Sequence, residues 1–356
     1  MIETTSKTSY NGNYGLNASW TIYNGSKRLN TIKQEKLNNQ AANLDVETSE
    51  NSIQESIAQI YIQILYAAES VKVNENTLQV SIAQRDRGQE LLNAGSIAKS
   101  DLAQLEAQVS TDRYQLVTAQ ATLQDYKLQL KQLLELDGEN EMNVYLPALS
   151  DENVLLPLPT KKDVYMSALT LRPEIEASKL SVEASELGID IAKAGYLPTI
   201  SLSAGIGTNH TSGSDFTFGE QVKNGWNNSI GVSVSVPIFN NRQTKSAVQK
   251  AKLQRETSLL SLLDEQKTLY KTIEGLWLDA NSAQQRYAAA NEKLRSTQIS
   301  YDLISEQFNL GMKNTVELLT EKNNLLQAQQ EQLQAKYMAI LNTQLLKFYQ
   351  GDKLAL

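Results

Sequence analysis

The sequence predicts a mainly α-helical protein with a small β part, in which very long antiparallel helical hairpins are joined to short strands. Three observations carry this prediction. The same order of segments is written twice at a constant spacing, two very long windows contain no proline, and three short segments alternate between apolar and polar residues.

The two internal repeats keep one spacing over a long distance. Segment 14–24 leads into a helical pattern, and segment 230–240 does the same, with Gly15 and Gly231 separated by 231 − 15 = 216 residues. The same offset still holds about eighty residues later, where Glu90, Asn93, Gly95, Asp101 and Leu102 match Glu306, Asn309, Gly311, Glu317 and Leu318. Equal repeats of this kind are expected when long elements lie side by side, as in the staves of an α-barrel.

Residues 14–22, 199–208 and 229–238 are the predicted strands. Each has one apolar and one small polar face, and each is about the length that a tilted strand needs to cross a bilayer. Strands of a transmembrane β-barrel and half-buried strands of a soluble sheet both fit this alternation. Segment 208–228, rich in Gly, Asn, Ser and Thr, is expected to be a mobile loop.

The windows 26–92 and 242–308 are predicted as two continuous helices, each roughly 100 Å long at 1.5 Å per residue. After Gly95 a seven-residue repeat follows, which indicates a returning helix in a left-handed coil. One apolar line of this repeat contains Leu102, Val109, Leu116, Leu123 and Leu130, and a second contains Leu105, Ala119, Tyr126 and Leu133 but is interrupted by Asp112. Long helices should therefore pair as antiparallel hairpins.

The domain organisation follows from these segments. Residues 1–136 form a first, partial repeat with a strand, a long helix and a return helix. Residues 137–163 break the periodicity with Gly138 and three prolines and are expected to be an equatorial linker. Residues 164–356 form the second repeat, in which helical spacing resumes near Asp163 and continues to about Ala194 before two strands, an outer loop, a long helix and a return helix.

Composition excludes several classes of function. The chain has no cysteine and one histidine, His210, so we predict no metal site and no cofactor. A net charge of −7 with scattered basic residues argues against nucleic acid as a partner. Phosphate-binding, metalloprotease and nucleophile-elbow motifs do not occur, and we predict that the protein is not an enzyme. There is no run of 18 apolar residues and no secretory signal at the start.

Taken in order, several motifs resemble the TolC family of outer-membrane efflux proteins. They open a helix at 171–175 (LRPEI), enter a strand at 194–200 (AGYLPTI), leave one at 236–240 (VPIFN), and turn between helices around Gly95 and Gly311. Each motif is weak alone, but their order and spacing are specific. The resemblance covers nearly the whole chain.

This resemblance implies a homotrimer in the outer membrane of a Gram-negative bacterium, extending into the periplasm. Each protomer would give four strands to a twelve-stranded transmembrane β-barrel, set in outer-membrane lipid, and four helical staves to a tunnel. The channel would be a passive export duct of a tripartite efflux or type I secretion system, with a periplasmic adaptor protein and an inner-membrane pump of RND or ABC type as partners. The cargo stays open.

The chain departs from the family pattern at its start. Residue 1 corresponds to residue 217 (1 + 216), so residues 164–216 have no counterpart in the first repeat, and we expect an N-terminally truncated chain. The alternative interpretation is a soluble structural coiled-coil or filament protein. The heptads alone would suffice for it, but they leave the three amphipathic strands unexplained.

The resemblance also implies two sets of site residues at the hairpin tips. Adaptor-contact positions are Asn93, Gly95, Asn309 and Gly311, and gate positions are Ser100, Asp101, Phe308, Lys313, Glu317 and Thr320. Phe308 and Lys313 stand where the family pattern has a tyrosine and an arginine, and Thr320 stands at an acidic position. Simpler roles stay open, because glycine commonly ends a helix and a carboxylate is favoured in the first turn of one.

Overall fold

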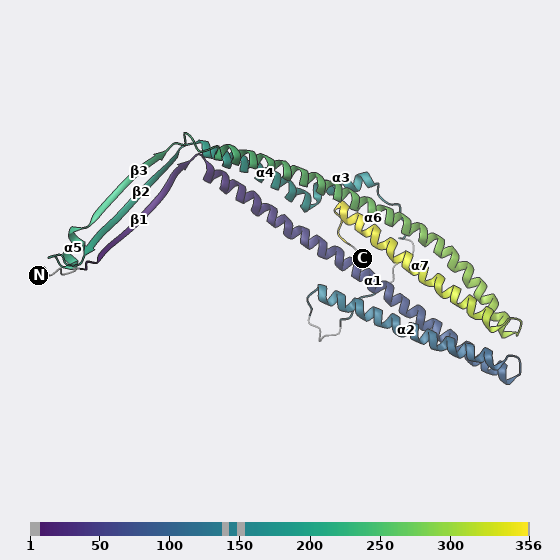
Figure 1. The fold of residues 1–356 in the computed structure, drawn as a ribbon. Coiled ribbons are helices and arrows are strands. Elements are labelled where there is room, and N and C mark those ends of the chain that lie inside the picture. Colours follow the sequence, from purple (N-terminus) through teal and green to yellow (C-terminus); the bar gives the residue numbers. More distant parts are fainter. Residues whose placement is uncertain (1–7, 137–141, 148–153, 355–356) are drawn as a thin grey trace. The chain divides into compact units, whose positions relative to one another are not determined.

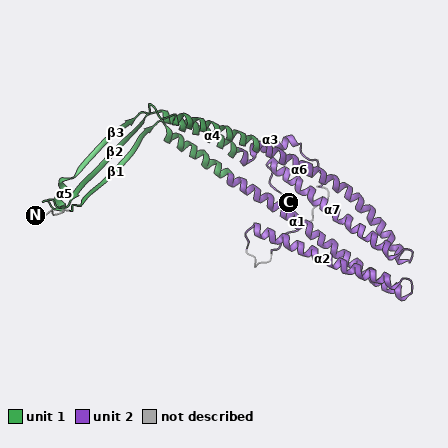
Figure 2. Cartoon of the chain, in the orientation of Figure 1, with its two compact units in different colours: residues 1–44, 176–264 green, residues 45–175, 265–356 purple. Residues whose placement is uncertain are grey.

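A computed structural model describes residues 8–136, 142–147 and 154–354, so parts of the predicted linker lie outside the described residues. The elements run in the order β1 (Asn11–Asn24), α1 (Lys27–Asn93), α2 (Lys99–Leu133), α3 (Lys161–Leu171), α4 (Pro173–Lys193), η2 (Ala194–Tyr196), β2 (Thr199–Thr211), α5 (Phe218–Asn224), β3 (Asn227–Ser235), α6 (Gln243–Asn309) and α7 (Thr315–Gln350) (Figure 1). They divide into two compact units, residues 1–44 with 176–264 and residues 45–175 with 265–356 (Figure 2).

The first unit contains an antiparallel sheet in the order β1-β2-β3. All three predicted strands are present, but β3 ends at Ser235 rather than at residue 238. Pro237 explains the early end, because proline has no N–H to donate to a strand ladder. The expectation of a loop over 208–228 was wrong in part. Strand β2 continues to Thr211, and the short helix α5 forms behind a capping box of Thr217 and Glu220.

The register of the sheet places like residues on the same face. Leu202 lies between Trp20 and Val232, and the neighbouring rows on that face are Leu16 with Ile206, and Ala18 with Ala204 and Ile230. The other face has rows of Ser19, Ser203 and Gly231, and of Thr21, Ser201 and Ser233. The apolar face is exposed in this chain, with Leu16 at 73% and Ile230 at 84% of full exposure. A large exposed apolar face of this kind indicates a surface that contacts lipid or another protein.

Helices α1 and α6 each contain 67 residues, which confirms the prediction within one residue at each end. Each helix begins after two consecutive residues with positive φ, Gly25 and Ser26 before α1 and Asn241 and Arg242 before α6. These two pairs are again 216 residues apart, so both copies use the same local geometry to change from strand to helix. None of the helices among the described residues is long and apolar enough to cross a bilayer.

The second unit contains the two helical hairpins. The tip-side part of α1 pairs with α2 in the first hairpin, and that of α6 pairs with α7 in the second. One core cluster joins Ala58, Ile62 and Leu65 of α1 to Tyr337, Leu341 and Leu345 of α7. Within this unit the described part of the linker lies on α6, where Gln284 donates to the carbonyls of Val154 and Leu156 and the Trp277 indole donates to that of Pro159.

The predicted continuous helical spacing from Asp163 to Ala194 is broken in the structure. Helix α3 ends at Leu171, Arg172 is extended, and α4 begins at Pro173. Proline is favoured at the first helical position and disfavours a helical conformation in the residue before it, so the Arg172–Pro173 pair both ends one helix and starts the next.

Candidate functional site

The two hairpin turns have the same backbone structure. Gly95 has φ +77° and Gly311 has φ +75°. At the first turn the Ser96 N–H donates to the Leu91 carbonyl and the Gly95 N–H to the Leu92 carbonyl, and the second turn repeats both bonds at Met312 and Gly311. This is the Schellman pattern of helix ends, which favours glycine at the left-handed position. The predicted helix-ending role of both glycines is therefore present.

The two predicted gate carboxylates each cap their own helix. The Ala98 N–H donates to Asp101 Oδ2 at 3.0 Å. At the second tip Asn314 and Glu317 form a complete capping box, and Lys313 Nζ lies 2.6 Å from Glu317 Oε1. The pKa of Glu317 is lowered, first by the hydrogen bond from Lys313 and then by the backbone N–H of Asn314. Both carboxylates thus have local partners within their own tip.

Phe308 is buried, at 2% of full exposure, and packs in one cluster with Leu91, Leu105 and Leu318. These residues come from both hairpins, so Phe308 joins the two tips by apolar packing. Ser100 and Thr320 are exposed, and the Thr320 hydroxyl donates to the Val316 carbonyl in its own helix. The structure therefore brings Phe308 to the contact between hairpins and leaves the other gate positions on the surface of their own tips.

Polar links between the hairpins continue away from the tips. Arg87 donates to the Asn309 carbonyl at 3.2 Å, and Gln84 donates to the Tyr301 hydroxyl at 2.8 Å. The most buried link is an ion pair between Lys322 of α7 and Asp112 of α2, which Ser81 of α1 joins by hydrogen bonds to both. The side chains of Lys322 and Asp112 are 3% and 1% exposed.

Sequence reasoning missed this ion pair. Asp112 appeared only as an interruption of an apolar heptad line, and the paired lysine lies 210 residues later. Burial lowers the pKa of Lys322, and Asp112 opposes this effect. Removing either partner would leave a buried charge unpaired, so the pair ties the hairpins together in one arrangement.

A second buried charge cluster explains the LRPEI motif. Arg172 donates to Glu174 at 2.8 Å and to Glu55 of α1 at 3.3 Å, and its guanidinium lies 4.3 Å from the ring centroid of Tyr349. Burial raises the pKa of Glu55 despite the arginine, and it raises that of Tyr349 to about 12. This cluster joins α1, α3, α4 and α7 at the end of the hairpins away from the tips.

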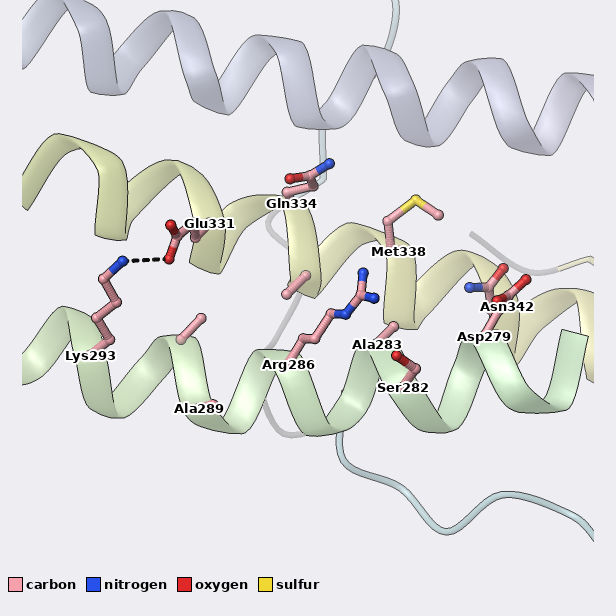
Figure 3. Close-up of a pocket in the computed structure, with 12 residues that line it drawn as sticks. Asp279, Ser282, Ala283, Arg286, Ala289, Lys293, Glu331, Gln334, Met338 and Asn342 are labelled. Carbon is pink, nitrogen blue, oxygen red and sulfur yellow. Dashed lines mark hydrogen bonds and ion pairs between the residues drawn. The ribbon is translucent and has the colours of Figure 1, made fainter.

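An open groove of about 540 Å³ lies between helices α6 and α7 in the second unit. Figure 3 shows Arg286 extending from α6 toward α7, between Gln334 and Met338, and Lys293 paired with Glu331 at 2.8 Å. Among the described residues, the Arg286 side chain has no hydrogen bond or ion pair. No group of three or more metal-binding side chains gathers within the described ranges.

Comparison with known proteins shows which family this sequence matches. The family model described as outer membrane efflux protein matches residues 2–135 and 164–351. The outer membrane efflux protein BepC of Brucella suis is 24% identical over 333 residues, covering 93% of this chain and 70% of BepC. The outer membrane protein TolC of Escherichia coli is 26% identical over 344 residues, covering 92% of this chain and 66% of TolC.

Solved structures have the same fold. A crystal structure of CusC matches with a TM-score of 0.84 at 19% identity, covering 99% of this chain and 80% of that one. The CmeC outer membrane channel of Campylobacter jejuni matches with a TM-score of 0.78 at 18% identity, covering 98% and 79%. The resemblance inferred from the sequence is confirmed, and the matched proteins are transport channels rather than filaments or enzymes.

Proposed function

This chain belongs to the outer membrane efflux protein family, and on this premise we propose that it forms the outer-membrane channel of a tripartite efflux or type I secretion system. The channel is a passive duct across the periplasm and the outer membrane. Because the chain spans about two thirds of the length of its curated relatives, this proposal concerns the whole channel to which these residues belong.

The three-stranded sheet is the observation that carries the proposal. Both of its faces are exposed, one formed by Leu, Ile, Val and Trp side chains and the other by Gly, Ser, Thr and Asn. A sheet with one lipid-facing side and one water-facing side has this pattern in a transmembrane β-barrel. A coiled-coil filament would not require a sheet with one apolar and one polar exposed face.

The proposed assembly is the homotrimer that the family resemblance implies. Within the proposal three copies pool their strands into one closed β-barrel, because an open sheet edge is not tolerated in lipid. Their helical hairpins line one tunnel across the periplasm. A periplasmic adaptor protein binds around Asn93, Gly95, Asn309 and Gly311, and an RND or ABC pump supplies the energy.

The gate is proposed at the tips. Three copies would place the Asp101 and Glu317 carboxylates around the entrance, flanked by Ser100, Thr320 and Lys313. Phe308 would hold each closed pair of tips through its apolar cluster with Leu91 and Leu105. Opening then requires the tips to separate and Phe308 to leave that cluster.

The cargo depends on the pump and adaptor rather than on this chain. Relatives are named for pyoverdine export in Pseudomonas putida, for alkaline protease secretion in Pseudomonas aeruginosa and for cation efflux in Escherichia coli. One channel scaffold therefore accompanies cargoes of very different size. The proposal assigns this protein to export and leaves the choice of cargo to its partners.

The test uses the full-length protein. It should fractionate with the outer membrane, require detergent for extraction, run as a trimer by native mass spectrometry and conduct ions in planar bilayers. Extraction in the aqueous fraction without detergent would overturn the proposal. Conductance should rise when Asp101→Asn is combined with Lys313→Gln, and unchanged conductance in an intact trimer would refute the gate alone.

A further inference from the structure

The open groove between α6 and α7 has a counterpart in the same chain that residues of a third helix help to line. Subtracting 216 from five of its lining residues, Arg286, Ala290, Glu331, Gln334 and Ala335, gives Ser70, Asn74, Gln115, Thr118 and Ala119. All five of these residues line the corresponding groove between α1 and α2. The two grooves are therefore the same structure in the two repeats.

Helix α7 of the same chain lies along the α1–α2 groove. Leu326 and Gln330 of α7 and Tyr114 of α2 complete its lining. Gln330 Oε1 accepts hydrogen bonds from Ser70 at 3.1 Å and Tyr66 at 3.4 Å. Among the described residues no third helix lines the α6–α7 groove in this way, and only Val154 of the linker packs against two of its lining residues, Ala283 and Ala335. The helix that corresponds to α7 is α2, because Leu326 and Gln330 match Ser110 and Tyr114 (326 − 216 and 330 − 216).

We propose that the α6–α7 groove is the socket for helix α2 of a second copy of this chain, in the register that α7 has on the α1–α2 groove. Tyr114 of the incoming helix then lies on Arg286, which takes the place of Ser70. An exposed tyrosine beside an arginine without a partner can form a cation–π contact. Tyr114 lines the α1–α2 groove of its own chain but is still 74% exposed, which leaves most of its ring free to meet a second copy.

Charge complementarity supports the same register. Lys322, Gln329, Asn76 and Thr77 are among the residues that line one small pocket where α7 lies on α1. The offset converts them into Glu106 and Arg113 of the second copy and Glu292 and Lys293 of the first. The four converted residues are two acids and two bases, with one of each from each copy, so their charges balance in this register. Lys293 also pairs with Glu331 of its own chain.

This inference rests on the proposed homo-oligomer and adds the surface, the register and the residue pairs through which neighbouring copies meet. Cross-linking tests it directly, because these 356 residues contain no cysteine. The variant Tyr114→Cys with Arg286→Cys is prepared as full chain in detergent and treated with a short thiol-specific cross-linker. The expected result is a shift from monomer to covalent multimers on a denaturing gel.

Two matched variants control the experiment. Ser70→Cys with Gln330→Cys should cross-link within one chain, giving a linked peptide without a multimer. Tyr114→Cys with Lys293→Cys is displaced by seven residues, about 10 Å along the helix, and should give little product. If native mass spectrometry shows a trimer but Tyr114→Cys with Arg286→Cys does not cross-link, the register is wrong while the proposed function stands. Absence of any oligomer overturns both.

A charge exchange gives a second, independent test. Arg113→Glu leaves three acids and one base at the contact and should reduce the fraction of trimer in detergent at low salt. Adding Glu292→Arg should restore it, because the contact then again has two acids and two bases. Glu292 also lies 4.0 Å from Arg295 of its own helix. Equal loss in the double and single variants would overturn the proposed contact.

Discussion

The two hairpins share one backbone plan, yet their interiors differ at matching positions. In the first hairpin Gly88 faces Leu105, and the counterparts of these residues in the second are Ile304 and Glu321. Asp112 is buried in the first hairpin, and its counterpart Ala328 is fully buried in the second. Lys322, which pairs with Asp112, corresponds to the exposed Glu106. The repeat thus conserves lengths and turns, while side chains decide which surfaces meet within one chain.

Among the side chains that differ between the hairpins, breaking the Asp112–Lys322 pair should reduce the unfolding free energy most. Lys322→Met leaves Asp112 buried without a cation and should cost about 3–5 kcal/mol of unfolding free energy. The measurement is denaturant unfolding in detergent. Adding Asp112→Ala should recover most of the loss, since the unpaired charge is then gone. A double variant as unstable as the single one would contradict the assigned pairing.

The close helix contact at Gly88 should come next. A Cβ at this position would overlap Leu105 Cδ1, so Gly88→Ala should destabilise the first hairpin by about 1–3 kcal/mol. Gly275 of α6 is the matched control, because open space surrounds it and alanine favours a helix by up to about 1 kcal/mol. Thermal unfolding should move in opposite directions for the two variants, and a shift of the same sign would refute the packing argument.

The two turns should respond alike to substitution. Gly95→Ala and Gly311→Ala each place a side chain at positive φ with open space around it, so each should cost about 1–2 kcal/mol. Hydrogen exchange at the adjoining helix ends measures the change. Clearly unequal losses would show that tertiary contacts, rather than the shared turn, hold one of the tips.

The smallest effect concerns pH and separates the two tips. The pKa of Glu317 is lowered mainly by Lys313, whose counterpart at the first tip is Ile97. A carboxyl group whose pKa is lowered by folding adds stability at any pH above its unfolded-state pKa. That stability is lost as the pH falls through the folded-state pKa. The difference in melting temperature between wild type and Glu317→Gln should therefore be present at neutral pH and vanish in acid. A difference independent of pH would contradict the Lys313 contact.

Much of the fold could be predicted from local pattern. Long windows without proline gave the bounds of α1 and α6, and the alternation gave the three strands. The break at Arg172–Pro173 was missed, because continuous helical spacing was expected from Asp163 to Ala194, although the LRPEI motif was expected to open a helix there. The family resemblance and the export-channel interpretation were confirmed by comparison. The two-repeat division of the chain, the gate residues and the tip contacts stay predictions.

The polar links between hairpins could not be predicted, and the reason is physical. Periodicity describes one helix at a time, whereas Asp112 and Lys322 meet only after two hairpins have packed. A charged residue inside an apolar heptad line indicates that a partner exists, but it does not say where in 356 residues the partner lies. The groove between α6 and α7 likewise forms only where two helices pack, so its lining could not be predicted from either helix alone.

The equal length of α1 and α6 restricts how this gene can change. Inserting one residue into either 67-residue helix would rotate everything beyond it by about 100° and advance it by about 1.5 Å, turning Leu91 or Phe308 away from their common cluster. An insertion in one long helix would be tolerated only together with an equal insertion in the other. Lineages carrying this scaffold should accordingly vary in substitutions and in loop size while the helical span stays fixed, or grows in both halves together.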